Sequence, residues 1–420
     1  MICFTNIRLI DPASGLDGPG GLLVQEGRIV ASGPEVTVPE GALPIDGGGA
    51  VLCPGLVDMR VGIGEPGGHH KDSVASAAAA AAAGGVTTLA ALPDTQPCID
   101  EPALVRLLRA RGEEAGVTIL PYGALTRGRA GNELAEIGLL RAAGAVAFTD
   151  ADRALSSARL MRSALLYART FDALIVQHPE EPSLAEGGMA TEGERALRMG
   201  LPGIPAEAEA IQVARDITLV RMTGGRLHFA HVSTAAALEL IRRAKHEGLA
   251  ITCDTAPPYF DLNEVAIGDW RTYAKLSPPL REEADRQAVA AALRDGTIDA
   301  VASDHQPRGA DDKRVPFVQA LPGGTGLATL LGITLAQVHG GGLPLIRALE
   351  LLTVAPARLL SSQAGTLAVG QPADLCLFAP ERAWRVEAGR LPGRAQNTPW
   401  DGRALEGRVL QTWRAGIRIF

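Results

Sequence analysis

Between about residues 55 and 355, short apolar runs alternate with helix-length amphipathic or alanine-rich segments. Short apolar runs bounded by turn residues predict buried strands, and repeated strand–helix units predict a parallel sheet. The expected strands are Val86–Ala91, Val117–Tyr122, Ala145–Phe148, Leu174–Gln177, Leu227–Ala230, Ala250–Cys253 and Ala300–Ala302. The expected helices are Asp72–Ala83, Pro102–Arg111, Ala158–Thr170, Ala206–Thr223, Ala235–His246 and Glu282–Leu293. Over a stretch of this length, the pattern predicts an α/β fold closed into a (β/α)8 TIM-type barrel.

The two ends of the chain have a different texture, with short strands broken by turn residues. Cys3–Ile10 alternates between apolar and polar residues, and strand texture returns at Gly365–Leu367, Asp374–Phe378 and Val409–Phe420. Alternation of this kind is typical of half-buried strands. We therefore expect residues 1–54 and 356–420 to pair into a small composite β-sandwich domain beside a barrel formed by residues 55–355.

Charge and cysteine content narrow the possible partners and the compartment. The chain has 40 basic and 47 acidic residues, a net charge of −7, which argues against binding to nucleic acid. Its five cysteines form no CxxC pair, as expected for a reducing cytoplasm rather than for a disulfide framework or zinc knuckle. No leader peptide and no membrane-spanning apolar run is evident, so the sequence predicts a cytoplasmic protein without membrane contact.

In a TIM-type barrel, chemistry belongs at the carboxyl ends of the strands. His178, His231 and Asp304 each follow a different expected strand. Histidine nitrogens and carboxylate oxygens are suitable ligands for a metal such as zinc. Each histidine taken alone is also compatible with a buried or capping role, but three such residues at three strand ends favour a metal site.

Several strand-end motifs of the chain resemble those of type I dihydroorotases, which are cyclic amidohydrolases of the amidohydrolase superfamily. The matching motifs are PGLVDMRVGIGEPG at 54–67, LPDTQP at 92–97, GAVAFTDAD at 144–152, FAHVST at 229–234, SPPLR at 277–281, ASDHQP at 302–307 and QNTPWDGRALEGRV at 396–409. The resemblance covers essentially the whole chain. It implies a metal-dependent barrel with a two-zinc site, in which a bridging hydroxide attacks the ring amide and an Asp, here Asp304, moves the proton.

The residues that would carry this chemistry are mostly replaced. The family's HxH pair is Arg60 and Gly62 here, the substrate-binding arginine is Gly64, the bridging carboxylate is Ala151, the asparagine of MPNT is Asp94, the asparagine before Pro-Pro is Ser277, and the last histidine of SDHAPH is Arg308. Only His178, His231 and Asp304 match the family pattern. The resemblance thus implies remnant metal positions, with no metal or at most one weakly bound Zn²⁺, and an Asp304 that no longer acts in catalysis.

These replacements favour a degenerate dihydroorotase homologue over a working enzyme. Within the family, some bacterial chains of this kind are non-catalytic subunits that assemble with aspartate transcarbamoylase in pyrimidine biosynthesis. We expect the same partner here, the catalytic subunit of aspartate transcarbamoylase, together with homo-oligomer formation. The alternative is an active zinc-dependent dihydroorotase, or a related cyclic amidohydrolase, with a reduced metal site. On the first interpretation, Arg60 replaces the metal and pairs with Asp304 or Asp94.

Other polar residues near the expected site have simpler explanations. His69 and His70 could serve as substitute ligands, but a solvated loop explains them better. Asp150 and Asp152 flank the lost bridging position, where either could approach a metal after a backbone shift, but turn or surface roles explain them better. Cys253 follows a strand in the same pocket region but has no local base, so we expect a buried thiol rather than a nucleophile.

Overall fold

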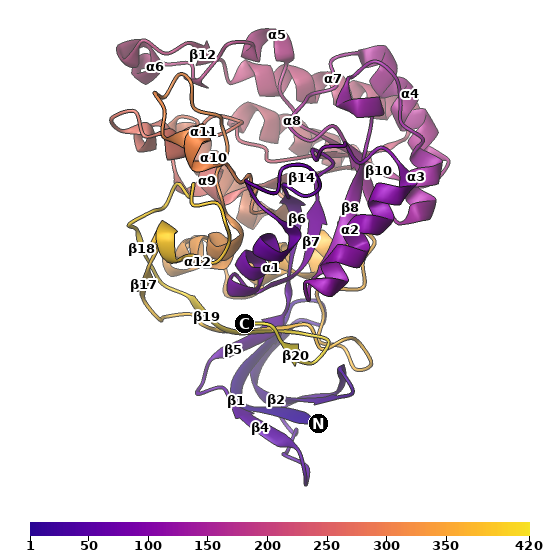
Figure 1. The fold of residues 1–420 in the computed structure, drawn as a ribbon, viewed down its shortest axis with the longest axis vertical. Coiled ribbons are helices and arrows are strands. Elements are labelled where there is room, and N and C mark those ends of the chain that lie inside the picture. Colours follow the sequence, from indigo (N-terminus) through magenta and orange to yellow (C-terminus); the bar gives the residue numbers. More distant parts are fainter.

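A computed structural model describes all 420 residues, and its centre is a parallel eight-stranded sheet curled into a barrel (Figure 1). The barrel strands are β6 (Leu56–Val61), β7 (Val86–Ala91), β8 (Thr118–Ala124), β9 (Ala147–Thr149), β10 (Leu174–Gln177), β13 (Arg226–Phe229), β14 (Ile251–Thr255) and β15 (Ala300–Val301). They lie in chain order, each parallel to the next. The predicted TIM-type barrel is confirmed.

The ring closes between its first and last strands. A parallel bridge pairs Val61 with His305, and the amide of Gly62 donates to the His305 carbonyl at 2.7 Å. The closure brings the residues that follow β6 beside those that follow β15, although about 240 positions separate them in sequence. It therefore decides which side chains meet at the mouth of the barrel.

Helices surround the barrel, and the longer ones bury their apolar sides against its outer face (Figure 1). They are α1 (Val74–Ala83), α2 (Pro102–Glu114), α3 (Ile137–Ala143), α4 (Ala158–Arg169), α5 (Pro182–Ala185), α6 (Glu194–Met199), α7 (Glu207–Thr223), α8 (Ala235–His246), α9 (Pro257–Asp261), α10 (Glu283–Asp295), α11 (Ala310–Lys313), α12 (Leu330–His339), α13 (Leu345–Leu352) and α14 (Val354–Leu359). Two short ladders, β11 (Ala190–Thr191) with β12 (Gly203–Ile204) and β17 (Trp384–Arg385) with β18 (Ala404–Leu405), lie outside the barrel. None of the helices combines the length and the apolar character that crossing a bilayer requires.

Strands from both ends of the chain form a second sheet below the barrel (Figure 1). Its members are β1 (Ile2–Asp11), β2 (Leu16–Gln25), β3 (Arg28–Gly33), β4 (Leu43–Asp46), β5 (Val51–Pro54), β16 (Leu375–Ala379), β19 (Arg408–Arg414) and β20 (Ile417–Arg418). β5 joins the two ends, because it runs parallel to β1 and antiparallel to β16. The strand expected at Gly365–Leu367 does not form, since Gly365 adopts a left-handed φ of +79° and lies in a bend.

The core of this second sheet depends on β5, which leads to a first prediction. Leu52 is fully buried in an apolar cluster built from both chain ends, whereas Leu43 on β4 is 59% exposed. We expect Leu52→Ala to lower the free energy of unfolding by about 2–5 kcal/mol. Leu43→Ala, the matched control, should change it by less than about 0.5 kcal/mol. Urea denaturation of both variants measures the difference, and equal effects would contradict the assigned role of β5.

Candidate active site at the barrel mouth

The three residues that match the family's metal pattern meet at the carboxyl ends of β10, β13 and β15. Nδ1 of His178 lies 2.8 Å from Nε2 of His231, and Nδ1 of His231 lies 3.1 Å from Oδ2 of Asp304. Glu180 extends this series of contacts, with its Oε2 3.5 Å from Nε2 of His178. The side chains form a continuous polar network at the barrel mouth.

Arg60 enters the same network from the end of β6. Its side chain is only 1% exposed, and its Nε donates to Oδ1 of Asp304 at 2.8 Å. Its Nη2 donates to the backbone carbonyl of Ala151 at 3.3 Å, so the position of the family's bridging carboxylate now offers only a peptide oxygen. Of the two partners considered for Arg60, the structure selects Asp304, while Asp94 is exposed.

The charges in this network compensate one another. Burial alone would raise the pKa of Asp304, but His231 and Arg60 together hold that pKa well below its usual range. Burial works against the charge of Arg60, yet Asp304 and its neighbours raise the pKa of the guanidinium. Burial, followed by the charge of Arg60, lowers the pKa of His231 to about 4. At neutral pH the centre is therefore an Arg60–Asp304 ion pair beside a neutral His231.

These protonation states leave few lone pairs for a metal. With Asp304 ionised and His231 neutral, Nδ1 of His231 donates to Asp304 and its Nε2 accepts a hydrogen bond from Nδ1 of His178, so both ring nitrogens have partners. Both oxygens of Asp304 are also in use, because Oδ1 accepts from Arg60 and Gln306 and Oδ2 accepts from His231. Zinc needs deprotonated nitrogen or oxygen donors at about 2.0–2.2 Å. The residues present do not fit the two-zinc centre that the family resemblance implies.

Two glycines mark where family side chains are missing. A Cβ atom built on Gly64 would lie 2.3 Å from the carbonyl oxygen of Gly68 and 2.5 Å from that of Asp72. A Cβ on Gly62 would lie 3.0 Å from the carbonyl oxygen of His305. The loop after β6 has thus closed over the space that an arginine at position 64 would need.

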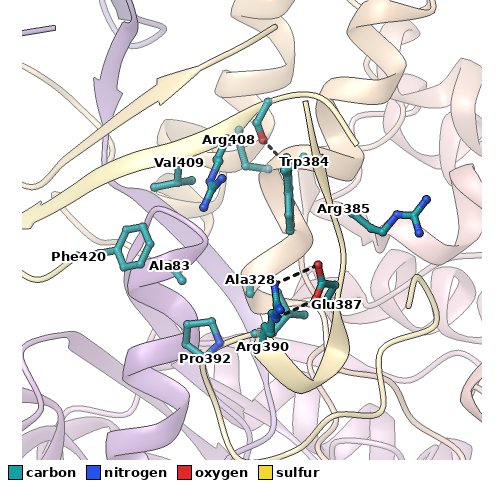
Figure 2. A pocket seen from close by; sticks show the side chains of 14 residues that line it. Ala83, Ala328, Trp384, Arg385, Glu387, Arg390, Pro392, Arg408, Val409 and Phe420 are labelled. Atoms are coloured by element: carbon teal, nitrogen blue, oxygen red, sulfur yellow. Dashed lines mark hydrogen bonds and ion pairs between the residues drawn. The ribbon is translucent and has the colours of Figure 1, made fainter. Parts of the chain in front are cut away.

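There is also little open volume beside Asp304. The cavity that Asp304 lines together with Ser277 and Gln306 measures about 10 Å³, room for about one water molecule. A cavity of about 380 Å³ lies elsewhere, between α1, α12 and the C-terminal segment, and Trp384 and Phe420 line it (Figure 2). No residue of the Arg60 network lines that second cavity, so it is separate from the barrel mouth.

The remaining sequence candidates lie outside the network. Asp150 caps a loop by accepting hydrogen bonds from the amides of residues 125 and 126 at 3.1 and 3.0 Å, and Asp152 pairs with Arg129. The side chain of His69 is 59% exposed, and His70 is also exposed. Cys253 is fully buried, as expected of a thiol without a catalytic role. It does not face the pocket region, because its thiol donates to the carbonyl of residue 297 at 3.3 Å in the core outside the barrel.

Three residues near the network were not singled out from the sequence. Tyr122 Oη, Glu180 Oε1 and both Nη atoms of Arg281 are buried without a hydrogen-bond partner, as is Nη1 of Arg60. Glu180 lies two positions after His178, and Arg281 ends the SPPLR motif, so their places in the sequence could have indicated them. Unpartnered buried polar atoms are costly and uncommon, and their concentration at the barrel mouth is the pattern expected of a functional site.

Comparisons with known proteins identify the family and the fold of the chain. Residues 49–237 match the family model described as "Dihydro-orotase-like". A protein named Dihydroorotase from Pelobacter propionicus is 44% identical over 99% of this chain and 98% of its own length. Another from Anaeromyxobacter dehalogenans is 43% identical over 96% and 94%. Among solved structures, the L-hydantoinase (dihydropyrimidinase) from Arthrobacter aurescens superposes with a TM-score of 0.88 at 26% identity, covering 100% of this chain and 95% of that one.

Proposed function

Since this chain belongs to the dihydroorotase-like family of cyclic amidohydrolases, we propose that it is a degenerate member that has exchanged metal-dependent hydrolysis for a structural role. The observation that carries the proposal is the buried Arg60–Asp304 ion pair, at 2.8 Å, between two positions to which the family resemblance assigns metal ligands. The guanidinium supplies the positive charge that Asp304 requires, with no ion in the site.

The size of the electrostatic effect supports this proposal. At an effective dielectric constant of about 20, one unit charge opposes another at roughly 4 Å by about 4 kcal/mol. A divalent cation near Arg60 would meet twice that opposition, while its ligands would be reduced to His178, His231 and Asp304. Even the loss of residues that only orient a ligand lowers metal affinity about 10–100-fold. The cavity that Asp304 lines measures about 10 Å³, which is too small for a six-membered ring.

For the structural role, we propose assembly with the catalytic subunit of aspartate transcarbamoylase, in the cytoplasm and as a homo-oligomer. The support is the resemblance to family members that lack the metal ligands and act as non-catalytic subunits. The five cysteines are all free thiols, and Cys53 faces Cys376 directly across β5 and β16. An unlinked pair of this kind suits a reducing compartment.

The partnership predicts a complex that survives chromatography. Coexpression of this chain with the transcarbamoylase of the same organism should give one size-exclusion peak that contains both proteins. A stable complex of this kind buries on the order of 1,000 Å² or more. The chain run alone on the same column reports its own oligomeric state. Two separate peaks at micromolar concentration, with full transcarbamoylase activity in the absence of this chain, would contradict the partnership.

A second candidate function is active cyclic amidohydrolysis with a single metal on His178, His231 and Asp304. The relatives named Dihydroorotase at 43–44% identity favour it. So does the backbone, because His231 and Asp304 keep left-handed φ angles of 39° and 50°, strained values that often mark functional sites. The two candidates differ in metal content and turnover. One zinc per chain together with hydrolysis would support the active amidohydrolase. The absence of both bound zinc and turnover would support the degenerate member.

A further inference from the structure

A small cavity formed by the loops after β6 and β15 and by the C-terminal segment gathers several basic side chains and no acidic one. It measures about 110 Å³ and has twelve lining residues. Five of these are Lys71, Arg308, Lys313, Arg314 and Arg394, and none is Asp or Glu. Lys and Arg make up only 40 of the 420 residues in a chain of net charge −7, so this concentration of positive charge runs against the overall composition. We call it the basic cavity.

The walls of the basic cavity come from distant parts of the chain and are held in place. Lys71 follows β6, Arg308 follows β15, and Arg394 lies in the C-terminal segment, which runs up beside the barrel toward α11 (Figure 1). Asn397 fixes that segment. Its Oδ1 accepts from the amide of Arg308 at 3.1 Å, and its Nδ2 donates to the carbonyl oxygens of residues 306 and 323 at 3.0 and 2.9 Å. The cavity is thus a built feature of the fold.

Lys313 is buried in the wall of this cavity without a counter-ion of its own. The residue is 2% exposed, and its Nζ donates to the carbonyl oxygens of Thr272 at 3.0 Å and Lys275 at 3.3 Å. An ammonium group has three protons, so one has no protein acceptor. Burial, and then the charges of Arg308 and Lys275, lowers the pKa of Lys313 to about 7. A buried ammonium in such company is costly unless an anion compensates it.

The protein itself supplies little of that compensation. Asp312 is near, but its carboxylate accepts from the amide of Gly309 at 2.9 Å and lies 3.8 Å from Lys71. The side chain of Arg308 donates only from Nε, to the carbonyl oxygen of residue 322 at 2.7 Å, and Arg394 donates from Nη1 to the carbonyl oxygen of residue 69. The guanidinium groups therefore keep unused donors in the forked arrangement that matches phosphate oxygens.

We propose that the basic cavity binds an anion of phosphate chemistry, either free inorganic phosphate or pyrophosphate, or the phosphate groups of a nucleotide. Phosphate fits because it presents several acceptor oxygens to converging arginine and lysine donors, and because the cavity has room for a group of that size rather than for a whole ring system. The inference goes beyond the proposed function, since it concerns a binding site whose occupancy does not depend on whether the protein hydrolyses anything.

Isothermal titration calorimetry of the full-length protein with inorganic phosphate, pyrophosphate and ATP tests the proposal. We expect binding by at least one of the three, weakened about 10–100-fold in Arg308→Gln/Arg394→Gln, because each lost charge-assisted hydrogen bond is worth about tenfold. The matched control is Arg106→Gln/Arg162→Gln, which removes two exposed arginines from α2 and α4 and leaves binding unchanged. Binding of ATP alone identifies a nucleotide, and binding of the inorganic anions identifies free phosphate.

Three results would overturn the proposal. The first is no heat of binding with any of the three anions at millimolar concentration. The second is equal binding by the cavity variant and the control variant, which would indicate non-specific attraction. The third is binding of polyglutamate that pyrophosphate does not displace, which would make the cavity part of a protein interface. Each readout is a binding constant and does not depend on turnover. A negative result here therefore rejects the anion site without bearing on the proposal that the protein no longer hydrolyses cyclic amides.

Discussion

Purified without chelator and supplied with zinc, manganese or cobalt, the protein is expected to turn over neither dihydroorotate nor carbamoyl aspartate above background. The physical reason is the Arg60–Asp304 ion pair, which joins two positions to which the family resemblance assigns metal ligands. Steady-state assays in both directions, with metal content measured on the same sample, check the expectation. A working family member assayed in parallel sets the scale.

Asp304→Ala separates residual activity from contamination. If the wild-type chain shows robust turnover and the variant does not, Asp304 is operative and the proposed loss of hydrolysis is wrong. If a trace of turnover is equal in both proteins, it comes from a co-purifying enzyme.

Restoring the histidine pair should not restore activity. Arg60→His/Gly62→His would return two ligands, but Ala151 would still lack the bridging carboxylate, and position 64 would still lack the substrate-binding arginine. That arginine cannot simply be added, because a Cβ at Gly64 would lie 2.3 Å from the carbonyl oxygen of Gly68. The loop after β6 would have to be rebuilt first. Full rescue by the double variant alone would contradict this expectation, because it would show that Ala151 and Gly64 do not prevent hydrolysis.

The barrel could be predicted from the sequence because its local signals and its tertiary structure agree. Leu174–Gln177 and Val86–Ala91 are apolar runs bounded by turn residues, and both form strands with the expected bounds. Ala235–His246 begins after Thr234, whose side chain caps the helix by accepting from the amide of Ala237. Where local patterns and packing agree, the sequence is sufficient.

Predictions at the chain ends were weaker because those signals are short. Gly365–Leu367 has strand-forming composition, but the backbone of Gly365 packs so closely on the carbonyl of Thr353 that a Cβ would lie 2.6 Å away. That contact joins residues that are twelve positions apart in the sequence, and no local sequence pattern predicts it. β4 at Leu43–Asp46 contains a proline and is largely exposed, so it lacked the apolar alternation of a strand.

The candidate site also has features that the sequence predicts and features that only the tertiary structure reveals. The strand ends placed His178, His231 and Asp304 at one mouth, because parallel strands all end on the same face. The choice of Asp304 over Asp94 as the partner of Arg60 depends on ring closure through Val61 and His305, which the sequence does not show. The basic cavity could not be predicted from the sequence for a similar reason. Its residues come from segments more than 300 positions apart and share no motif.

Loss of Arg60 should destabilise the protein more than any surface substitution. Arg60→Met is expected to lower the free energy of unfolding by about 3–5 kcal/mol, because it leaves the Asp304 carboxylate buried without its counter-charge. Arg198→Met is the matched control. Arg198 also pairs with a carboxylate, that of Glu194, but both side chains are 76% exposed, so the cost should stay below about 1 kcal/mol. Urea denaturation at neutral pH measures both variants.

The second half of the test replaces both partners. Arg60→Met/Asp304→Leu removes the two charges together and should recover most of the stability lost in either single variant, since an apolar pair of similar volume can substitute for a buried ion pair. A double variant as unstable as the sum of the two single variants would show no coupling between Arg60 and Asp304. A wild-type protein whose unfolding midpoint rises sharply with added zinc would contradict the proposal more directly, because a ligand stabilises the folded state only when it binds there. Arg60 would then share the mouth with a metal instead of replacing it.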